Sequence, residues 1–255
     1  MSDRVWDRFL TEQDKAHLQL SRERRVGFGT QPALLLIDLY RWVFGDEPLP
    51  LLEGMKLWPG YCGPAAWNAI PQIQRLQSAA RAAGIPVIHV TGLNDETSGV
   101  PGWNEAAHRD AGRRARSEDP VARERYARRY EIMPELGPLP GEVLLHKTSP
   151  SAFWGTPLVG HLNYLDVDTI LVAGESTSGC VRASVVEGCT NRYRMQVVEE
   201  CVFDRHEACH AINLFDMDQK YASVISLDEA TGYLSTIRGG AAGTSQPQRE
   251  LIASR

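Results

Sequence analysis

One cysteine occupies a position that favours chemistry over packing. The stretch from Gly174 to Cys180, GESTSGC, runs from an apolar segment into small, hydroxylated residues, and its cysteine opens the next predicted helix. A thiol at a helix N-terminus meets the positive end of the helix dipole and free backbone N–H groups. We therefore expect a lowered thiol pKa, a nucleophilic thiolate, and amides that can hold an oxyanion.

A cysteine nucleophile needs a proton acceptor, and two charged residues end other apolar runs. Asp38 follows ALLLI, and Lys147 ends EVLLHK. An acid at the end of a buried run is solvated, paired or functional. A lysine beside Asp38 would keep the carboxylate ionised and orient it. Taken singly, each residue also fits a strand-end charge that reaches solvent, but together with Cys180 they suit an activated nucleophile.

The remaining cysteines fit small buried packing residues. There are five cysteines in all, the count is odd, and no CxxC occurs. These features exclude a disulfide framework and a four-cysteine zinc site, and they indicate a reducing compartment.

A second motif belongs to a different class of enzyme. His206-Glu-Ala-Cys-His210 matches the H-E-x-x-H pattern of zinc hydrolases. The motif starts at a predicted helix N-terminus instead of inside a helix, and no third ligand is indicated. A zinc hydrolase using His206 and His210 is therefore kept as the alternative from another class.

The elements that must position these residues follow from the apolar pattern. Nearly continuous apolar runs indicate strands buried on both faces, as in a parallel sheet. Predicted helices at 65–83, 179–193 and 206–221 separate several of them, which favours a doubly wound α/β fold. Sites in such folds lie beyond the carboxyl ends of the strands, where Asp38, Lys147 and Cys180 fall. The six runs cover 33–38, 86–91, 142–147, 168–174, 195–200 and 222–227.

Length and composition fit one globular α/β domain. The chain has 255 residues, of which 43% are hydrophobic and 23% charged. We divide it into an N-terminal arm (1–30), an α/β domain (31–237) and a flexible C-terminal tail (238–255). The N-terminus lacks an apolar signal core, and no run approaches the ~20 residues of a membrane helix. The expectation is a cytoplasmic protein with no membrane partner.

Charge disfavours a nucleic-acid partner. The formal net charge is −5, whereas nucleic-acid binders need a basic footprint. Residues 109–130 do hold eight arginines against four acidic residues. Without interleaved aromatic residues, this segment fits a solvated face or a subunit interface better than a phosphate-binding patch. In an acidic protein, an anionic substrate would have to be captured by local positive groups.

The chain resembles the isochorismatase-like cysteine hydrolases over about residues 26–230, and within them the N-carbamoylsarcosine amidase and maleamate amidohydrolase branch. The resemblance implies a three-layer α/β/α fold with a six-stranded parallel sheet and a catalytic triad of Asp38, Lys147 and Cys180. It also implies a cis peptide between Glu175 and Ser176, and an oxyanion hole formed by the Ser176 and Cys180 amides. The stretches that carry it are GFGTQPALLLIDLYRWVFG, EIMPELGPLPGEVLLHKTSPSAFWGTPL and DTILVAGESTSGCVRASVVEG.

Details of the motifs refine the expected site. The turn reads STSGC, unlike the ATDYC type of nicotinamidases, and their metal-binding set has no counterpart after 86–91, so no metal or cofactor is expected. Arg205 falls where this branch holds a substrate carboxylate, although an ion pair at the surface or an interface fits it equally. Thr177, Phe153 and Trp154 are further candidates for substrate binding, and core packing fits the two aromatics as well.

The expected activity is therefore hydrolysis of a C–N bond with release of ammonia. Cys180 would attack a small ureide or amide and form a thioester or thiocarbamate. N-carbamoylsarcosine, biuret and triuret are the ureide candidates, and a maleamate-type amide is the alternative within the family. A non-catalytic binding protein is a third possibility, which the complete triad disfavours. The family resemblance also implies a homo-oligomer, commonly a tetramer.

Overall fold

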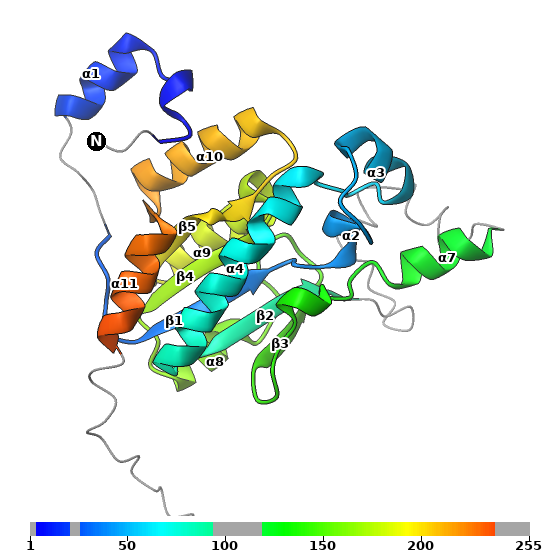
Figure 1. Cartoon of the computed structure of the whole chain (residues 1–255). Helices are drawn as coiled ribbons and strands as arrows, with labels where there is room; N and C mark the ends of the chain where they lie inside the picture. The colour runs from blue at the N-terminus through cyan, green and yellow to red at the C-terminus, as the bar shows by residue number, and fades with distance from the viewer. Residues whose placement is uncertain (1–3, 21–25, 94–118, 238–255) are drawn as a thin grey trace, which may run out of the picture.

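The computed structural model describes residues 4–20, 26–93 and 119–237. Six parallel strands form one sheet in the order β3-β2-β1-β4-β5-β6, with helices on both faces (Figure 1). This confirms the predicted doubly wound α/β fold. The strands are β1 (Pro32–Ile37), β2 (Val87–Gly92), β3 (Val143–Lys147), β4 (Thr169–Glu175), β5 (Arg194–Phe203) and β6 (Ser223–Ile225).

The sheet separates two hydrophobic cores, which explains the continuous apolar runs. Along β1, Leu34 and Leu36 pack into one core, while Leu35 and Ile37 pack into the other. Each central strand therefore needs apolar residues at successive positions. The first core lies under α4 (Pro64–Ala83) and α11 (Leu227–Ile237). The second lies under α8 (Leu158–Tyr164), α9 (Arg182–Thr190) and α10 (Glu207–Lys220).

The strand order fixes where a site can form. From β1 the chain adds β2 and β3 on one side, and then β4, β5 and β6 on the other. Strand order thus reverses between β1 and β4, and open α/β sheets bind ligands at such a switch point. Ile37 pairs in register with Gly174. The residues that follow these two, Asp38 and Glu175, therefore leave the sheet side by side.

Short elements connect and cover the strands. Helices α2 and α3 lie between β1 and α4, beyond the carboxyl end of β1 (Figure 1). A five-residue turn, η3, lies between β4 and α9. The other short elements that the structure describes are helical and lie outside the sheet. The short elements are η1 (Asp7–Phe9), α1 (Glu12–Leu20), α2 (Arg41–Phe44), α3 (Leu51–Leu57), α7 (Pro120–Ala127), η2 (Pro134–Leu136) and η3 (Thr177–Val181).

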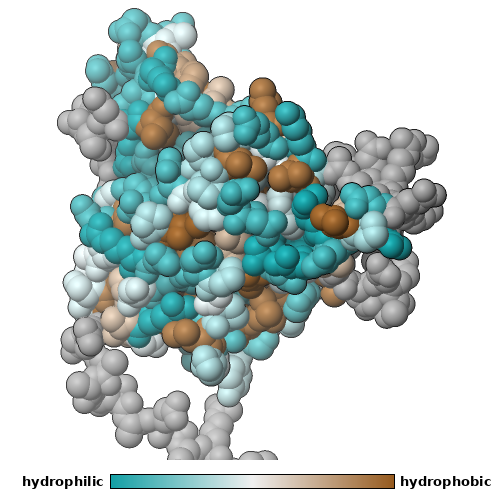
Figure 2. Space-filling model, turned by 45° about the vertical axis from the view of Figure 1, so that its right-hand side comes forward, coloured by the Kyte–Doolittle hydropathy of each residue, from teal (hydrophilic) through white to brown (hydrophobic). Residues whose placement is uncertain are grey.

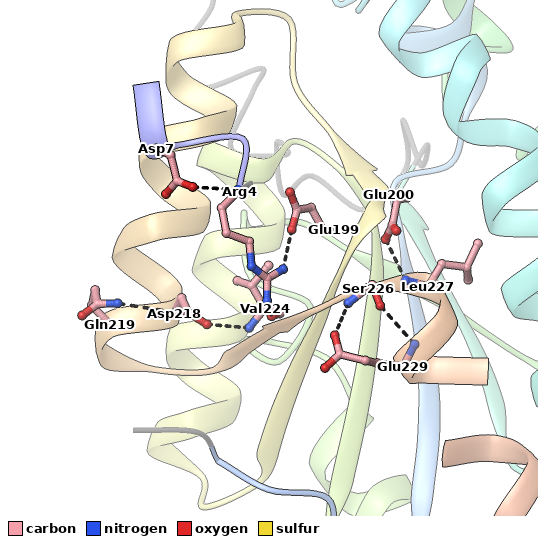
Figure 3. Close-up of polar contacts among 10 residues, drawn as sticks. All are labelled: Arg4, Asp7, Glu199, Glu200, Asp218, Gln219, Val224, Ser226, Leu227 and Glu229. Carbon is pink, nitrogen blue, oxygen red and sulfur yellow. Dashed lines mark hydrogen bonds and ion pairs between the residues drawn. The ribbon is translucent and has the colours of Figure 1, made fainter. Parts of the chain in front are cut away.

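The first described residues of the N-terminal segment pack against α10 and the neighbouring strands β5 and β6. Trp6 is buried, with its ring centroid 6.1 Å from that of Phe215 on α10. The Arg4 guanidinium pairs with Glu199 at 2.7 Å and donates to the Val224 carbonyl at 3.1 Å (Figure 3). Helix α1, in contrast, buries none of its residues. The tail expected at 238–255 and residues 109–118 of the arginine-rich segment lie outside the described residues.

The described surface carries its apolar side chains singly on the face shown in Figure 2, where they are dispersed among hydrophilic residues. Leu20, Leu52, Trp154 and Tyr164 are among the most exposed large hydrophobic residues. Within residues 4–20, 26–93 and 119–237, no helix has the length and apolar character needed to cross a membrane.

Candidate active site

Asp38 is held at the switch point by a backbone hydrogen bond to β2. Its backbone N–H donates to the Val90 carbonyl of β2 at 2.9 Å, and its side chain is fully buried. Its backbone has a φ of 56°, in the left-handed region that Asp tolerates better than most residues. The strand thus ends at Asp38, with the carboxylate inside the protein.

Lys147 joins the carboxylate to the thiol. Its Nζ lies 2.9 Å from Asp38 Oδ2, and it donates to Cys180 Sγ at 3.4 Å and to the Ser149 carbonyl at 3.1 Å. The contact with Oδ2 is an ion pair between two buried side chains. Among the described residues, Asp38 Oδ1 has no hydrogen-bond partner. A lone pair therefore remains for the thiol proton.

Cys180 lies in the turn η3, just before α9, and only 6% of it is exposed. Its carbonyl accepts a hydrogen bond from Ser184 Oγ at 2.7 Å, and the same hydroxyl accepts one from the Ala152 N–H at 2.9 Å. Ser184 thus ties Cys180 to the loop after β3. The peptide bond between Glu175 and Ser176 is cis, at the position that the family resemblance implied.

A second acid holds the turn from the side of β5. Glu175 pairs with Phe203 in the sheet, so the residue after Phe203, Asp204, lies beside the turn. Asp204 Oδ2 accepts hydrogen bonds from the Ser178 N–H at 2.8 Å and from Ser178 Oγ at 2.6 Å. These bonds fix the segment whose Ser176 and Cys180 amides are the predicted oxyanion hole.

Electrostatics correct one expectation for the thiol. Burial and the negative Asp38 raise the pKa of Cys180 well above its usual value, and the positive Lys147 opposes this only in part. The helix dipole was expected to lower it. Desolvation outweighs the dipole because the sulfur is enclosed and faces a carboxylate. The raised pKa favours a neutral Cys180 thiol over a thiolate, so a nucleophilic role would need a base.

The pKa values of Asp38 and Lys147 suit the removal of a proton from the Cys180 thiol. Burial raises the pKa of Asp38, and the charge of Lys147 limits the rise. Burial tends to lower the pKa of Lys147, but Asp38 and Cys180 outweigh it and raise that pKa. Lysine stays positive beside an ionised carboxylate whose proton affinity exceeds that of an ordinary aspartate. This is the state in which Asp38 can take a proton from Cys180.

Glu175 adds a carboxyl group that sequence reasoning used only to place the cis peptide. Its side chain is buried, and its Oε1 accepts a hydrogen bond from Cys62 Sγ at 3.6 Å. Burial, together with Asp38 and Asp204, raises the pKa of Glu175 to about 8, against the influence of Arg205. Glu175 is therefore largely protonated at neutral pH.

Arg205 borders this cluster, and its guanidinium contacts backbone. It donates to the Gly60 carbonyl at 2.8 Å and to the Tyr61 carbonyl at 3.1 Å. The backbone N–H of Arg205 donates to Asp204 Oδ1 at 2.8 Å. The structure thus places Arg205 near the site, where it anchors the segment before α4.

The other predicted substrate-binding residues lie at different depths. Thr177 is fully buried, with Oγ1 2.8 Å from His210 Nδ1. Phe153 is buried in the second core, 6.0 Å from the Tyr193 ring between centroids. Trp154 is 65% exposed and lines a surface hollow beside α9 with Ser149 and Arg182. The triad lines neither this hollow nor a second one near Tyr130 and His146.

The H-E-x-x-H motif lies at the start of α10. His206 precedes the first helical residue, and His210 faces Thr177 through Nδ1. Across the described ranges, no group of three or more His, Cys, Asp or Glu side chains is arranged to hold a metal ion.

Three supporting residues were missed by sequence reasoning: Ser184, Asp204 and Gly174. The position of Asp204 after an apolar strand is the same signal that identified Asp38. Ser184 lies four residues after Cys180, one helical turn away, which places it under the nucleophile. Gly174 has a φ of 124°, and an added Cβ would lie 2.0 Å from the Ile37 carbonyl oxygen. Only glycine fits there.

Comparison with known proteins connects this geometry to a family of hydrolases. A model described as the Isochorismatase domain matches residues 32–229. A maleamate amidohydrolase from Pseudomonas putida is 33% identical over 216 residues, covering 85% of this chain and 92% of that protein. An N-carbamoylsarcosine amidase from Arthrobacter sp is 30% identical over 216 residues, covering 84% of this chain and 75% of that protein.

A solved structure supports the fold independently. The cysteine hydrolase from Pseudomonas syringae pv. phaseolicola 1448A superposes with a TM-score of 0.66 at 19% identity, covering 85% of this chain and 98% of that one. At this identity the likeness concerns the architecture alone.

Proposed function

This chain belongs to the Isochorismatase family, and from that membership we propose that it is an amidohydrolase with a cysteine nucleophile. The substrate is a small ureide or amide whose C–N bond is cleaved with release of ammonia. A carbamoyl substrate such as N-carbamoylsarcosine, biuret or triuret is favoured, and the relative named N-carbamoylsarcosine amidase supports it. The relative named maleamate amidohydrolase supports a plain amide as the second candidate.

One observation carries the proposal: a buried thiol, ammonium and carboxylate in contact at the switch point. Lys147 Nζ lies 2.9 Å from Asp38 Oδ2 and 3.4 Å from Cys180 Sγ. Structural ion pairs also occur inside proteins. Here, however, the pair contacts a thiol that starts a helix, and Asp38 Oδ1 has no hydrogen-bond partner among the described residues. A nucleophile, its base and the group orienting the base are thus together.

The first half of the reaction forms the covalent intermediate. Asp38 takes the thiol proton as Cys180 Sγ attacks the substrate carbonyl carbon, and Lys147 stabilises the negative charge that moves between them. The carbonyl oxygen becomes an oxyanion held by the Ser176 and Cys180 amides, each worth about 10²–10³ in rate in comparable sites. The C–N bond then breaks, and Asp38 returns its proton to the departing nitrogen, which leaves as ammonia.

The second half restores the enzyme. A thiocarbamate or thioester remains on Cys180, depending on whether the substrate is a ureide or an amide. Asp38 removes a proton from water, the resulting hydroxide adds to the carbonyl carbon, and the C–S bond breaks. The departing sulfur recovers its proton from Asp38, and the product leaves as an acid or carbamic acid.

The experiment is an ammonia-release assay across N-carbamoylsarcosine, biuret, triuret and maleamate. The native enzyme should hydrolyse at least one of them, and Cys180→Ala should lose that activity by about 10⁴-fold or more. Cys209→Ser, at an exposed thiol, is the matched control and should stay active. An active Cys180→Ala variant would remove the cysteine mechanism. Loss of activity with a chelator but not with iodoacetamide would instead favour zinc bound by His206 and His210.

A further inference from the structure

Glu175 lies beside Asp38 and Cys180. Gly174 and Ile37 are in register on neighbouring strands, so Glu175 leaves the sheet beside Asp38. Its buried carboxyl interacts electrostatically with Asp38 and Cys180. On the other side, Phe203 pairs with Glu175, and this brings Asp204 and Arg205 alongside.

The contacts of Glu175 do not account for a buried acid. Buried carboxylates in structural roles are paired with cations or accept several hydrogen bonds. Among the described residues, the hydrogen bond shown for Glu175 Oε1 is a long one from the Cys62 thiol at 3.6 Å. The Arg205 guanidinium beside it donates to the Gly60 and Tyr61 carbonyls. A buried acid with so little structural partnership is a candidate for contact with ligand.

The described charges around Glu175 leave no surplus positive charge for an anion. Asp38 and Asp204 contribute two negative charges, and Lys147 and Arg205 contribute two positive charges, so these four sum to zero. Glu175 adds nothing when protonated and one negative charge when ionised. A carboxylated substrate would therefore sit beside three acids with no uncompensated cation among the described groups.

We propose that the balanced charges of the site favour an uncharged ureide over carboxylated substrates, and that Glu175 is the specificity-determining residue that binds the ureide. This rests on the proposed amidohydrolase function and names its substrate class. A protonated carboxyl offers one O–H donor and one carbonyl acceptor. A ureide presents the complementary set, N–H donors next to a C=O acceptor. Burial keeps the acid in the neutral form that can make both bonds, as in other sites that use a neutral acid as a donor.

The state of Glu175 has a consequence for pH dependence. The pKa of Glu175 is about 8, so the side chain becomes negative as the pH rises past that value. The new charge further raises the pKa of the Cys180 thiol and opposes the developing oxyanion. Activity on the uncharged ureide should therefore fall above about pH 8. The other groups that face Glu175 are Asp38, Asp204, Arg205, Cys62 and Tyr40.

The experiment compares native enzyme, Glu175→Gln and the control Glu53→Gln, whose acid lies on an exposed face of α3. The probes are biuret, which is uncharged, and N-carbamoylsarcosine, which carries a carboxylate. The native enzyme and the control should prefer biuret in kcat/KM by about tenfold or more, and both should lose activity above about pH 8. Glu175→Gln keeps a neutral donor and acceptor but cannot ionise, so its activity on biuret should lose the alkaline decline.

Preference for N-carbamoylsarcosine, or an alkaline limb that Glu175→Gln leaves unchanged, would overturn the role of Glu175. Either result still requires ammonia release that depends on Cys180, so the proposed function would stand. If no substrate of the panel releases ammonia in a Cys180-dependent way, the proposed function itself fails. Unfolding curves of the three proteins verify that a lost activity does not come from a lost fold.

Discussion

Lys147 sets the charge state of the site, because its ammonium group contacts both Asp38 and Cys180. Removing the positive charge would leave Asp38 buried among acids and raise its pKa further. A protonated Asp38 cannot accept the thiol proton. At the residue scale, the proposed mechanism therefore depends on an ion pair whose main role is to keep a buried base ionised.

Lys147→Gln tests this role. We expect kcat/KM for the best substrate to fall by about 10²–10⁴-fold at neutral pH. We also expect the acid limb of the pH profile to move to higher pH, since Asp38 would lose its proton only there. Lys220→Gln, which removes an exposed lysine paired with Asp216, is the control. An acid limb at the native pH in Lys147→Gln would show that Lys147 does not tune Asp38.

Residue positions could be predicted from the sequence where a charge ends an apolar run. Asp38, Lys147 and Cys180 were found in this way, and the structure brings them together. The pKa of Cys180 could not be predicted, because it depends on how deeply the sulfur is buried and on which charges face it. Asp204 contacts the turn, and Arg205 contacts the segment before α4. These partners are far apart in sequence, so no local sequence pattern predicts the contacts.

At the element scale, the strand ends form the site, and at Gly174 the backbones of β4 and β1 leave no room for a side chain. β4 has a register shift between Val172 and Gly174 against β5. A side chain at Gly174 would meet the Ile37 backbone of β1. The glycine therefore lets β4 approach β1 and places the turn to Cys180 beside Asp38.

Gly174→Ala should be strongly destabilising. The new methyl group would combine a φ of 124° with a backbone clash, so we expect a loss of about 3 kcal/mol or more in the free energy of unfolding. Urea denaturation monitored by circular dichroism measures it. Gly84→Ala is the matched control, with a φ of 72° but no atom within 4 Å of the added Cβ; its cost should be nearer 1 kcal/mol. Equal losses in the two variants would contradict the close approach of β4 to β1.

Element boundaries could be predicted best for the buried central strands. The run at 168–174 corresponds to β4 at Thr169–Glu175, and the run at 33–38 to β1 at Pro32–Ile37. β5 extends past the predicted end at 200 to Phe203. Its two acids are accommodated by other elements: Glu199 pairs with Arg4, and Glu200 accepts the Leu227 N–H (Figure 3). Those partners are remote in sequence, so the pattern alone underestimated the strand.

The start of α11 was missed although the sequence carries a local signal for it. The run at 222–227 predicted a strand, whereas β6 ends at Ile225 and α11 begins at Leu227. Ser226 and Glu229 form reciprocal hydrogen bonds, with the Ser226 N–H donating to Glu229 Oε2 and the Glu229 N–H donating to Ser226 Oγ. This capping box, S-x-x-E, marks a helix start. The strand pattern of the preceding apolar residues obscured it.

At the scale of the whole molecule, the site is an enclosed polar cluster inside an acidic protein. The net charge is −5, and the groups described around the triad add no excess of positive charge. The field of the protein therefore opposes capture of an anion, in agreement with an uncharged substrate. The sequence could indicate the net charge, but the balance of charges within the site required the register of β1, β4 and β5.

The most direct test of the account is intact-protein mass spectrometry of the enzyme quenched during turnover of its best substrate. The cysteine mechanism predicts an added mass equal to the carbamoyl or acyl fragment. Peptide mapping should place it on Cys180, and it should be absent from Cys180→Ala. Ammonia release at the native rate by Cys180→Ala, or a covalent fragment on a residue other than Cys180, would contradict the central claim.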